Sequence, residues 1–166
     1  MAITRLGGAN AITGALPAAN INATSLGNVD VGKVLQVVQG IKTTSFVSTS
    51  TTYVGTGLTA DITPSSTSSK ILILVRTDFD TRSNTANVLA TVFRDTTNLG
   101  GGSDDALFRV NASASGRIIA GQSISYLDSP SSTSTLTYEL YAKAPLQWIT
   151  PGGNDTATIQ LLEIQG

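Results

Sequence analysis

The fold class is decided by residues 69–79, which read Ser-Lys-Ile-Leu-Ile-Leu-Val-Arg-Thr-Asp-Phe. Side chains of a β-strand point alternately to its two faces, so this stretch divides into two sets. The first set contains Ile71, Ile73, Val75, Thr77 and Phe79. The second set contains Lys70, Leu72, Leu74, Arg76 and Asp78. Both sets begin apolar, which predicts a strand in the middle of a sheet, or one whose second face a neighbouring subunit covers.

The second half of this stretch becomes polar. Arg76, Asp78, Asp80 and Arg82 alternate along one face, so we expect this end to reach solvent or a charged contact. Paired carboxylates can serve acid–base chemistry or bind Ca²⁺. The two arginines on the same face favour the other interpretation, in which the two aspartates belong to a solvated or intersubunit ladder of ion pairs.

The composition argues against several classes of function. Charged residues make up 13% of the 166 residues, and the formal net charge is −1. The ten Lys and Arg residues are scattered, whereas phosphate binding needs a clustered basic surface, so we expect no nucleic-acid partner. Cysteine and histidine are both absent, which removes the commonest general base and the commonest metal ligand. We therefore expect a protein without enzymatic activity, cofactor or bound metal.

The hydropathy pattern gives no sign of a membrane partner. The longest aliphatic run, residues 71–75, is far too short to span a bilayer. Residues 1–8 lack the apolar region of a signal peptide. We expect synthesis in the cytoplasm and no membrane contact.

Residues 1–31 differ from the rest of the chain. They contain no aromatic residue and only two charges, Arg5 and Asp30. Their isolated large apolar residues are Leu6, Ile12, Leu16, Ile21 and Leu26. Ordering one residue costs about 1–2 kcal/mol, and burying one Leu or Ile returns about 1.5–3 kcal/mol, so such sparse anchors cannot order this segment on its own domain. We expect an extended arm that anchors along other chains; the alternative is a disordered terminus.

The sequence pattern of residues 32–166 is that of a β domain. Short apolar or alternating runs are separated by turn residues such as Pro64, Gly116 and Pro130, and no stretch has a convincing helical period. The predicted strands cover residues 34–39, 45–53, 58–62, 69–79, 88–95, 106–110, 117–127, 133–143 and 156–164. So many short strands predict an all-β, antiparallel β-sandwich or jelly roll over residues 32–166, preceded by the arm.

Two features outside the predicted core could contact a ligand. Asp104 and Asp105 follow three glycines, but the spacing of oxygen ligands in a Ca²⁺ loop is absent, so we interpret them as a polar loop tip. Trp148 lies between Pro145 and Pro151, where it could present a rigid aromatic surface to a ligand. Tyr138, by contrast, occupies an inward position of its strand and is expected in the core.

Four stretches of the sequence carry a resemblance. They read Met-Ala-Ile-Thr-Arg-Leu-Gly-Gly at 1–8 with Leu-Pro-Ala-Ala-Asn at 16–20, Gly-Lys-Val-Leu-Gln-Val-Val at 32–38, Ile-Thr-Pro-Ser-Ser-Thr-Ser-Ser-Lys-Ile-Leu-Ile-Leu at 62–74, and Ala-Thr-Ile-Gln-Leu-Leu-Glu-Ile at 157–164. Together they resemble small structural virion proteins of tailed bacteriophages, particularly marine and cyanobacterial phages. These motifs are structural patterns and contain no catalytic signature.

The resemblance implies a jelly-roll domain, often trimeric, that is displayed on the virion and attached by an N-terminal arm. It implies a capsid-decoration protein, a head or tail fibre, or a collar component, made in the cytoplasm of the host bacterium. We therefore expect a non-enzymatic homotrimer whose arm contacts capsid, collar or tail proteins, with Leu72 and Leu74 on the oligomer face. The alternative, from another class, is a carbohydrate- or receptor-binding module that contacts a host surface glycan through loops around Trp148 and residues 100–105.

Overall fold

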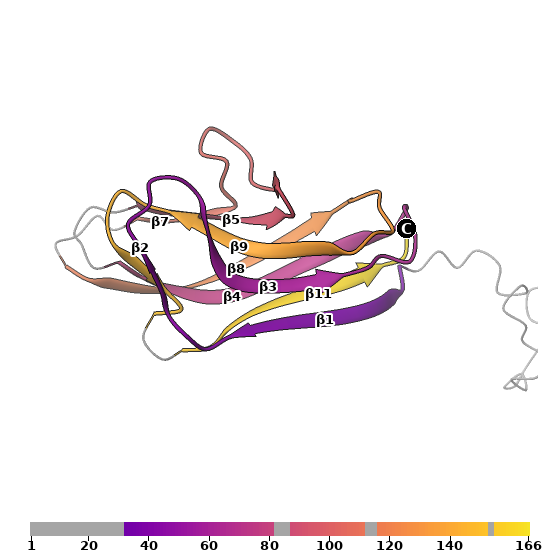
Figure 1. Ribbon diagram of the computed structural model, residues 1–166, viewed down its shortest axis with the longest axis horizontal. Helices are drawn as coiled ribbons and strands as arrows, with labels where there is room; N and C mark the ends of the chain where they lie inside the picture. The colour runs from indigo at the N-terminus through magenta and orange to yellow at the C-terminus, as the bar shows by residue number, and fades with distance from the viewer. Residues whose placement is uncertain (1–31, 82–86, 112–115, 153–154) are drawn as a thin grey trace, which may run out of the picture. The chain divides into compact units, whose positions relative to one another are not determined.

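The computed structural model describes residues 32–81, 87–111, 116–152 and 155–166. These residues form two antiparallel β-sheets packed face to face, with no helix among them (Figure 1). The predicted all-β sandwich is therefore confirmed. The arm at residues 1–31 lies outside the described residues, and so do its proposed anchors Leu6, Ile12, Leu16, Ile21 and Leu26.

The first sheet, called sheet A, is built around its longest strand. Its four long strands lie in the order β1 (Val34–Lys42), β11 (Ala157–Ile164), β4 (Lys70–Thr81) and β8 (Ile118–Asp128). Beyond the residues that pair with β11, β4 also pairs with β10 (Trp148–Thr150), which in turn pairs with β2 (Phe46–Ser48).

The second sheet, called sheet B, covers the inner face of sheet A. Its order is β3 (Val54–Ile62), β9 (Leu136–Lys143) and β5 (Asn87–Arg94), and both β6 (Thr97–Asn98) and β7 (Phe108–Asn111) pair with β5. Apart from the two- and three-residue strands β2, β6 and β10, the strands thus follow the order β1-β11-β4-β8 in one sheet and β3-β9-β5-β7 in the other. This is the strand order of a jelly roll.

The central position predicted for residues 69–79 is confirmed for β4. One edge of β4 pairs with β8 from Ile71 to Thr81, and the other edge pairs with β11 and β10. Ile71 and Ile73 point inward and are fully buried, whereas Leu72 lies on the outer face and is partly exposed. The largest buried side chains that meet between the sheets are Trp148, Tyr138, Phe79, Leu58, Ile62, Ile71, Ile73, Leu140, Ile159 and Leu161.

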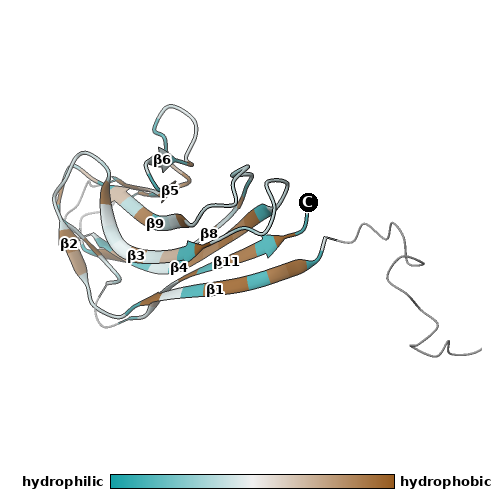
Figure 2. Ribbon diagram, turned by 45° about the vertical axis from the view of Figure 1, so that its right-hand side comes forward, coloured by the Kyte–Doolittle hydropathy of each residue, from teal (hydrophilic) through white to brown (hydrophobic). Residues whose placement is uncertain are grey.

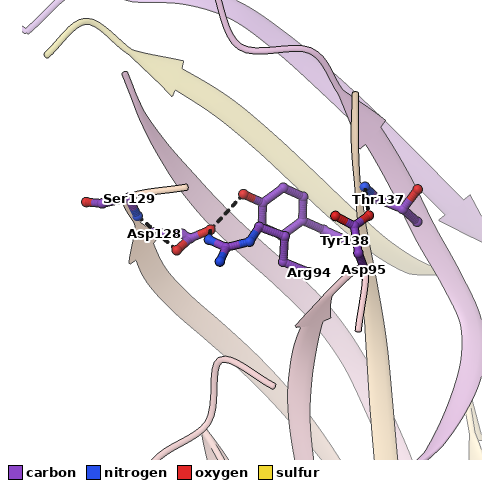
Figure 3. A network of polar contacts seen from close by, with 6 residues as sticks. All are labelled: Arg94, Asp95, Asp128, Ser129, Thr137 and Tyr138. Carbon is purple, nitrogen blue, oxygen red and sulfur yellow. Dashed lines mark hydrogen bonds and ion pairs between the residues drawn. The ribbon is translucent and has the colours of Figure 1, made fainter. Parts of the chain in front are cut away.

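A buried carboxylate fastens the two sheets together at the end of β8 (Figure 3). Asp128 Oδ2 accepts hydrogen bonds from Arg94 Nη1 on β5 at 2.6 Å and from the Tyr138 hydroxyl on β9 at 2.8 Å. Its other oxygen accepts from the Ser129 amide at 2.9 Å. Burial raises the pKa of Tyr138, and the hydrogen bond to Asp128 raises it further. The phenol therefore stays protonated and keeps donating to the carboxylate.

A second buried carboxylate, Glu163 on β11, holds the loop that leads into β4. Its Oε1 accepts from the amide of Ser65 at 2.7 Å and from the hydroxyl of Ser65 at 2.6 Å, and its Oε2 accepts from Gln36 Nε2 at 2.7 Å. Burial alone would raise the pKa of Glu163, but the hydrogen bonds from Ser65 and Gln36 help to lower it to about 2. Folding therefore favours the ionised form of this side chain.

This depressed pKa predicts how stability depends on pH. Since the pKa of Glu163 falls from 4.5 to about 2 on folding, its contribution is complete above about pH 4.5 and is lost as the pH falls towards about 2. We expect Glu163→Gln to have a lower urea midpoint than wild type at neutral pH. The difference should shrink at about pH 3. The exposed Asp61→Asn serves as the control; equal losses of stability for wild type and Glu163→Gln on acidification would contradict the prediction.

Candidate interaction surface

An aliphatic row crosses the outer face of sheet A. Val37 on β1 pairs with Leu162 on β11, Leu162 pairs with Leu72 on β4, and Leu72 pairs with Leu127 on β8. Residues directly opposite each other on neighbouring strands share one face of a sheet, so the four side chains form a continuous row. Val37 is 60% exposed and Leu127 is 50% exposed. We call these four residues the aliphatic row.

Strand β1, at the edge of sheet A, carries further exposed aliphatic residues. Val34, Leu35 and Ile41 are all exposed, and Figure 2 shows hydrophobic stretches along β1. Exposed aliphatic residues scattered singly are normal on a soluble protein, whereas neighbouring ones mark surfaces that contact other molecules. The outer face of sheet A is therefore the strongest candidate for an interaction surface among the described residues.

The structure places both predicted oligomer residues on this face but in different surroundings. Leu72 belongs to the aliphatic row. Leu74 is flanked by Gln160 on β11 and Ser125 on β8. The other members of the row were not predicted, because the sequence does not show which residues of distant strands lie opposite each other.

Two adjoining cavities continue along the outer face beyond the aliphatic row. The smaller, of about 270 Å³, lies over Leu74, Ser125 and Gln160. The larger, of about 470 Å³, lies over Asp78, Gly121 and Asp155. Arg76 and Ser123 line both of them. The face thus changes from aliphatic at one end of β4 to polar and charged at the other.

The polar end of β4 is buried, which corrects the expected solvated ladder. Asp80 is fully buried, and Arg117 Nε and Nη2 donate to its two oxygens at 2.8 and 2.7 Å. Asp78 is 9% exposed and accepts from the Gly152 amide at 2.9 Å. The expectation of a charged contact holds for Asp80, for which Arg117 is one partner, and Arg82 lies outside the described residues. The physical reason is that residues 148–152 return to this end of β4 and cover it.

Gly152 makes this close approach possible. A Cβ atom at this position would lie 2.5 Å from Asp78 Oδ2 and 3.0 Å from Asp80 Cβ. Burial raises the pKa of Asp78; the Gly152 hydrogen bond opposes this shift, and the charges of Asp155 and Asp80 add to it. Despite these neighbouring carboxylates, the described residues contain no group of three or more acidic side chains arranged to hold a metal ion.

The prediction that Trp148 contacts a ligand is wrong. Its side chain is fully buried, with ring centroids 5.6 Å from Phe46 and 5.9 Å from Phe79. Strand β10 joins sheet A and turns the indole into the sandwich, where it fills the core. Tyr138 is also fully buried, as predicted.

Partly exposed aromatic residues gather instead on the outer face of sheet B. The ring of Phe93 lies 6.1 Å from that of Tyr53 and 4.1 Å from that of Tyr141, and Lys143 Nζ lies 4.3 Å above the Tyr53 ring. The Tyr53 hydroxyl donates to the carbonyl oxygen of Asp104 at 3.0 Å, which ties this cluster to the loop at residues 99–107. Burial raises the pKa of Tyr53 to about 12, with the charges of Asp105 and Asp104 contributing. We call Tyr53, Phe93 and Tyr141 the aromatic cluster.

The predicted polar loop tip contains both paired and exposed groups. Asp105 is exposed, and Asp104 accepts a hydrogen bond from Arg109. The adjacent aromatic cluster was not predicted, because its three residues come from separate strands and loops whose pairing is not visible in the sequence. The nearest sequence signal was the outward position of Tyr141 in its alternating strand.

No protein-family model matches the chain, and no curated protein matches it in sequence. The described residues include no helix long and apolar enough to cross a membrane.

The raised pKa of Asp78 predicts that its ionisation destabilises the fold at the polar end of this surface. Because the folded pKa lies above the ordinary value of 3.8, ionising Asp78 weakens the folded state as the pH rises through the folded pKa. The amide oxygen of Asn can still accept the Gly152 hydrogen bond. We therefore expect Asp78→Asn to raise the urea midpoint at neutral pH and Asp61→Asn to leave it nearly unchanged. A lower midpoint for Asp78→Asn would show that its charge stabilises the fold.

Proposed function

We propose that this protein is a non-enzymatic structural protein of a bacteriophage virion, which self-associates as a homotrimer on the particle surface. The aliphatic row on the outer face of sheet A is the observation that supports this proposal most strongly. Full burial of a Leu or Val side chain contributes about 1.5–3 kcal/mol, so completing the burial of a half-exposed one contributes about 1 kcal/mol. A contact between copies through this face would bury several such side chains of each copy, and their contributions to the free energy of association would add.

The attachment to the particle is assigned to residues 1–31. Their spaced anchors Leu6, Ile12, Leu16, Ile21 and Leu26 suit an extended segment that lies along capsid, collar or tail proteins. The jelly-roll domain would then act as capsid decoration or as part of a head or tail fibre. A jelly roll alone hosts many functions, so the proposal depends on the arm and the aliphatic row together with the resemblance to phage virion proteins.

A non-enzymatic role agrees with the partners of the two neighbouring aspartates. Asp80 is held by a bidentate pair with Arg117, and Asp78 binds the Gly152 amide. Acid–base chemistry of the glycosidase type needs two carboxyl groups that can reach a substrate. Asp80, which is fully buried and paired, does not meet that requirement.

A second candidate function, glycan or receptor binding, now depends on the aromatic cluster instead of Trp148. Partly exposed rings beside a loop that contains Asp104 and Asp105 offer stacking surface and polar groups side by side. A glycan array with the wild type and Tyr141→Ala tests this candidate. Binding by the wild type that Tyr141→Ala abolishes would favour it, and no binding by the wild type would remove it.

The proposed oligomer contact is tested by placing a charge in the aliphatic row. We expect a mass of three copies for the wild type by light scattering, and a smaller mass for Val37→Asp and for Leu72→Asp, because each variant places a carboxylate in an apolar contact. Val37 is 60% exposed, so its substitution should leave the fold intact by circular dichroism. Ser134→Asp adds the same charge at an exposed turn and should remain trimeric. A wild type that stays monomeric over a dilution series would contradict the proposal.

The role of the arm is tested by removing it. A protein consisting of residues 32–166 should keep the mass of the full chain, because the aliphatic row lies within this domain. We expect it to fail to decorate particles that lack the native protein, whereas the full chain should restore decoration. Decoration by the shortened protein would show that the arm is not the anchor.

A further inference from the structure

Among the described residues, strand β8 forms one long edge of sheet A. Its eleven residues, Ile118–Asp128, pair along their whole length with β4, and no other strand among the described residues pairs with them. In an antiparallel ladder, alternate residues direct their N–H and C=O groups to opposite sides. About half of the β8 residues therefore present backbone donors and acceptors to the outside, which is a template for pairing with another strand.

The features that normally prevent such pairing are missing from β8. It contains no proline, no lysine and no arginine, its single charge is Asp128 at its last position, and its register with β4 has no bulge. The other long edge strands of the described sheets, β1 and β3, each contain a register shift. The remaining edge strands β2, β6 and β7 have three, two and four residues. Short, bulged or charged edges resist pairing, so β8 is exceptional.

The side chains of β8 are complementary to a second copy of β8. An antiparallel register centred on Ser123 would pair all eleven residues, and it would place Ile119 opposite Leu127 of the second copy. These two side chains are 53% and 50% exposed and lie on the outer face at the two ends of the strand. Between them this face carries Gly121, Ser123 and Ser125, which are small. A Cβ atom at Gly121 would meet no atom within 4 Å, so the outer face is open at this position.

We propose that two copies of this protein associate through β8, paired antiparallel about a two-fold axis at Ser123. The two A sheets would then form one continuous sheet, and the aliphatic row of each copy would continue from Leu127 onto Ile119 of the other. The proposal depends only on the geometry of β8 and not on the virion role. The contact differs from the face-to-face contact of the proposed trimer, and where both form it links each trimer to neighbouring trimers.

The absence of cysteine from the chain makes disulfide trapping a clean test. Residues directly opposite each other in an antiparallel pair have Cα atoms about 4.5–5.5 Å apart, within the range that a disulfide spans. Full-length Ser123→Cys should therefore form a disulfide-linked dimer under mild oxidation. Ser125→Cys is the matched control, because its two copies would lie about 13 Å apart along the strands, at four residues of separation. A mixture of Ser125→Cys and Gly121→Cys should form the mixed dimer.

Each outcome of the trapping experiment decides the proposal. Failure of Ser123→Cys to cross-link faster than Ser125→Cys would overturn it, and so would preferential cross-linking of Ser123→Cys to Gln39→Cys, which would show pairing of β8 with β1. Light scattering gives a second readout: Ser123→Lys, which sets two like charges opposite each other, should abolish this association, and Ser123→Thr should keep it. Val37→Asp should leave the Ser123→Cys cross-link unchanged, so loss of the trimer contact is distinguished from loss of the β8 contact.

Discussion

The position of β4 between strands on both of its edges is the constraint on which the rest of the structure depends. Its hydrogen-bonding groups are taken up by β8 on one side and by β11 and β10 on the other, so its register cannot shift without disturbing three neighbours. A shift of one residue would turn Ile71, Ile73 and Val75 out of the core. The same register brings Leu72 into line with Leu162 and Leu127. The aliphatic row is therefore a direct consequence of the pairing that builds the core.

Buried carboxylates fix the ends of the long strands in sheet A. Glu163 on β11 binds Ser65 and Gln36, and Asp128 on β8 binds Arg94 and Tyr138 of the opposite sheet. A buried charge is tolerated only where donors surround it, and removing its partner is strongly destabilising. In a chain with 13% charged residues, these acidic side chains therefore act as structural fasteners. Asp80 on β4 is buried and paired in the same way, with Arg117.

The sequence predicted the elements whose pattern is local. The strand expected at residues 69–79 is Lys70–Thr81, and the one expected at residues 117–127 is Ile118–Asp128, because alternation and turn residues are read within the strand itself. The weakly alternating stretch 45–53 was less well predicted: only Phe46–Ser48 forms a strand there, and the next one begins at Val54. The side chains of Trp148 and Asp78 were predicted to be exposed but are buried, because segments distant in the sequence cover them. Contacts between such distant segments are set by tertiary packing and cannot be read from the sequence. The pairing of Val37 with Leu162 is another example.

The two proposed contacts act in different directions, and this difference bears on the kind of structure that the protein can build. Packing through the outer face of sheet A brings copies together along the normal of the sheet and ends in a closed trimer. Pairing through β8 extends the sheet within its own plane and links one closed unit to the next. A protein that uses both contacts spreads over a surface, whereas a fibre needs contacts repeated along a single axis. If the β8 pairing is found, capsid decoration is favoured over a fibre, because the same edge that joins two copies also joins their trimers side by side.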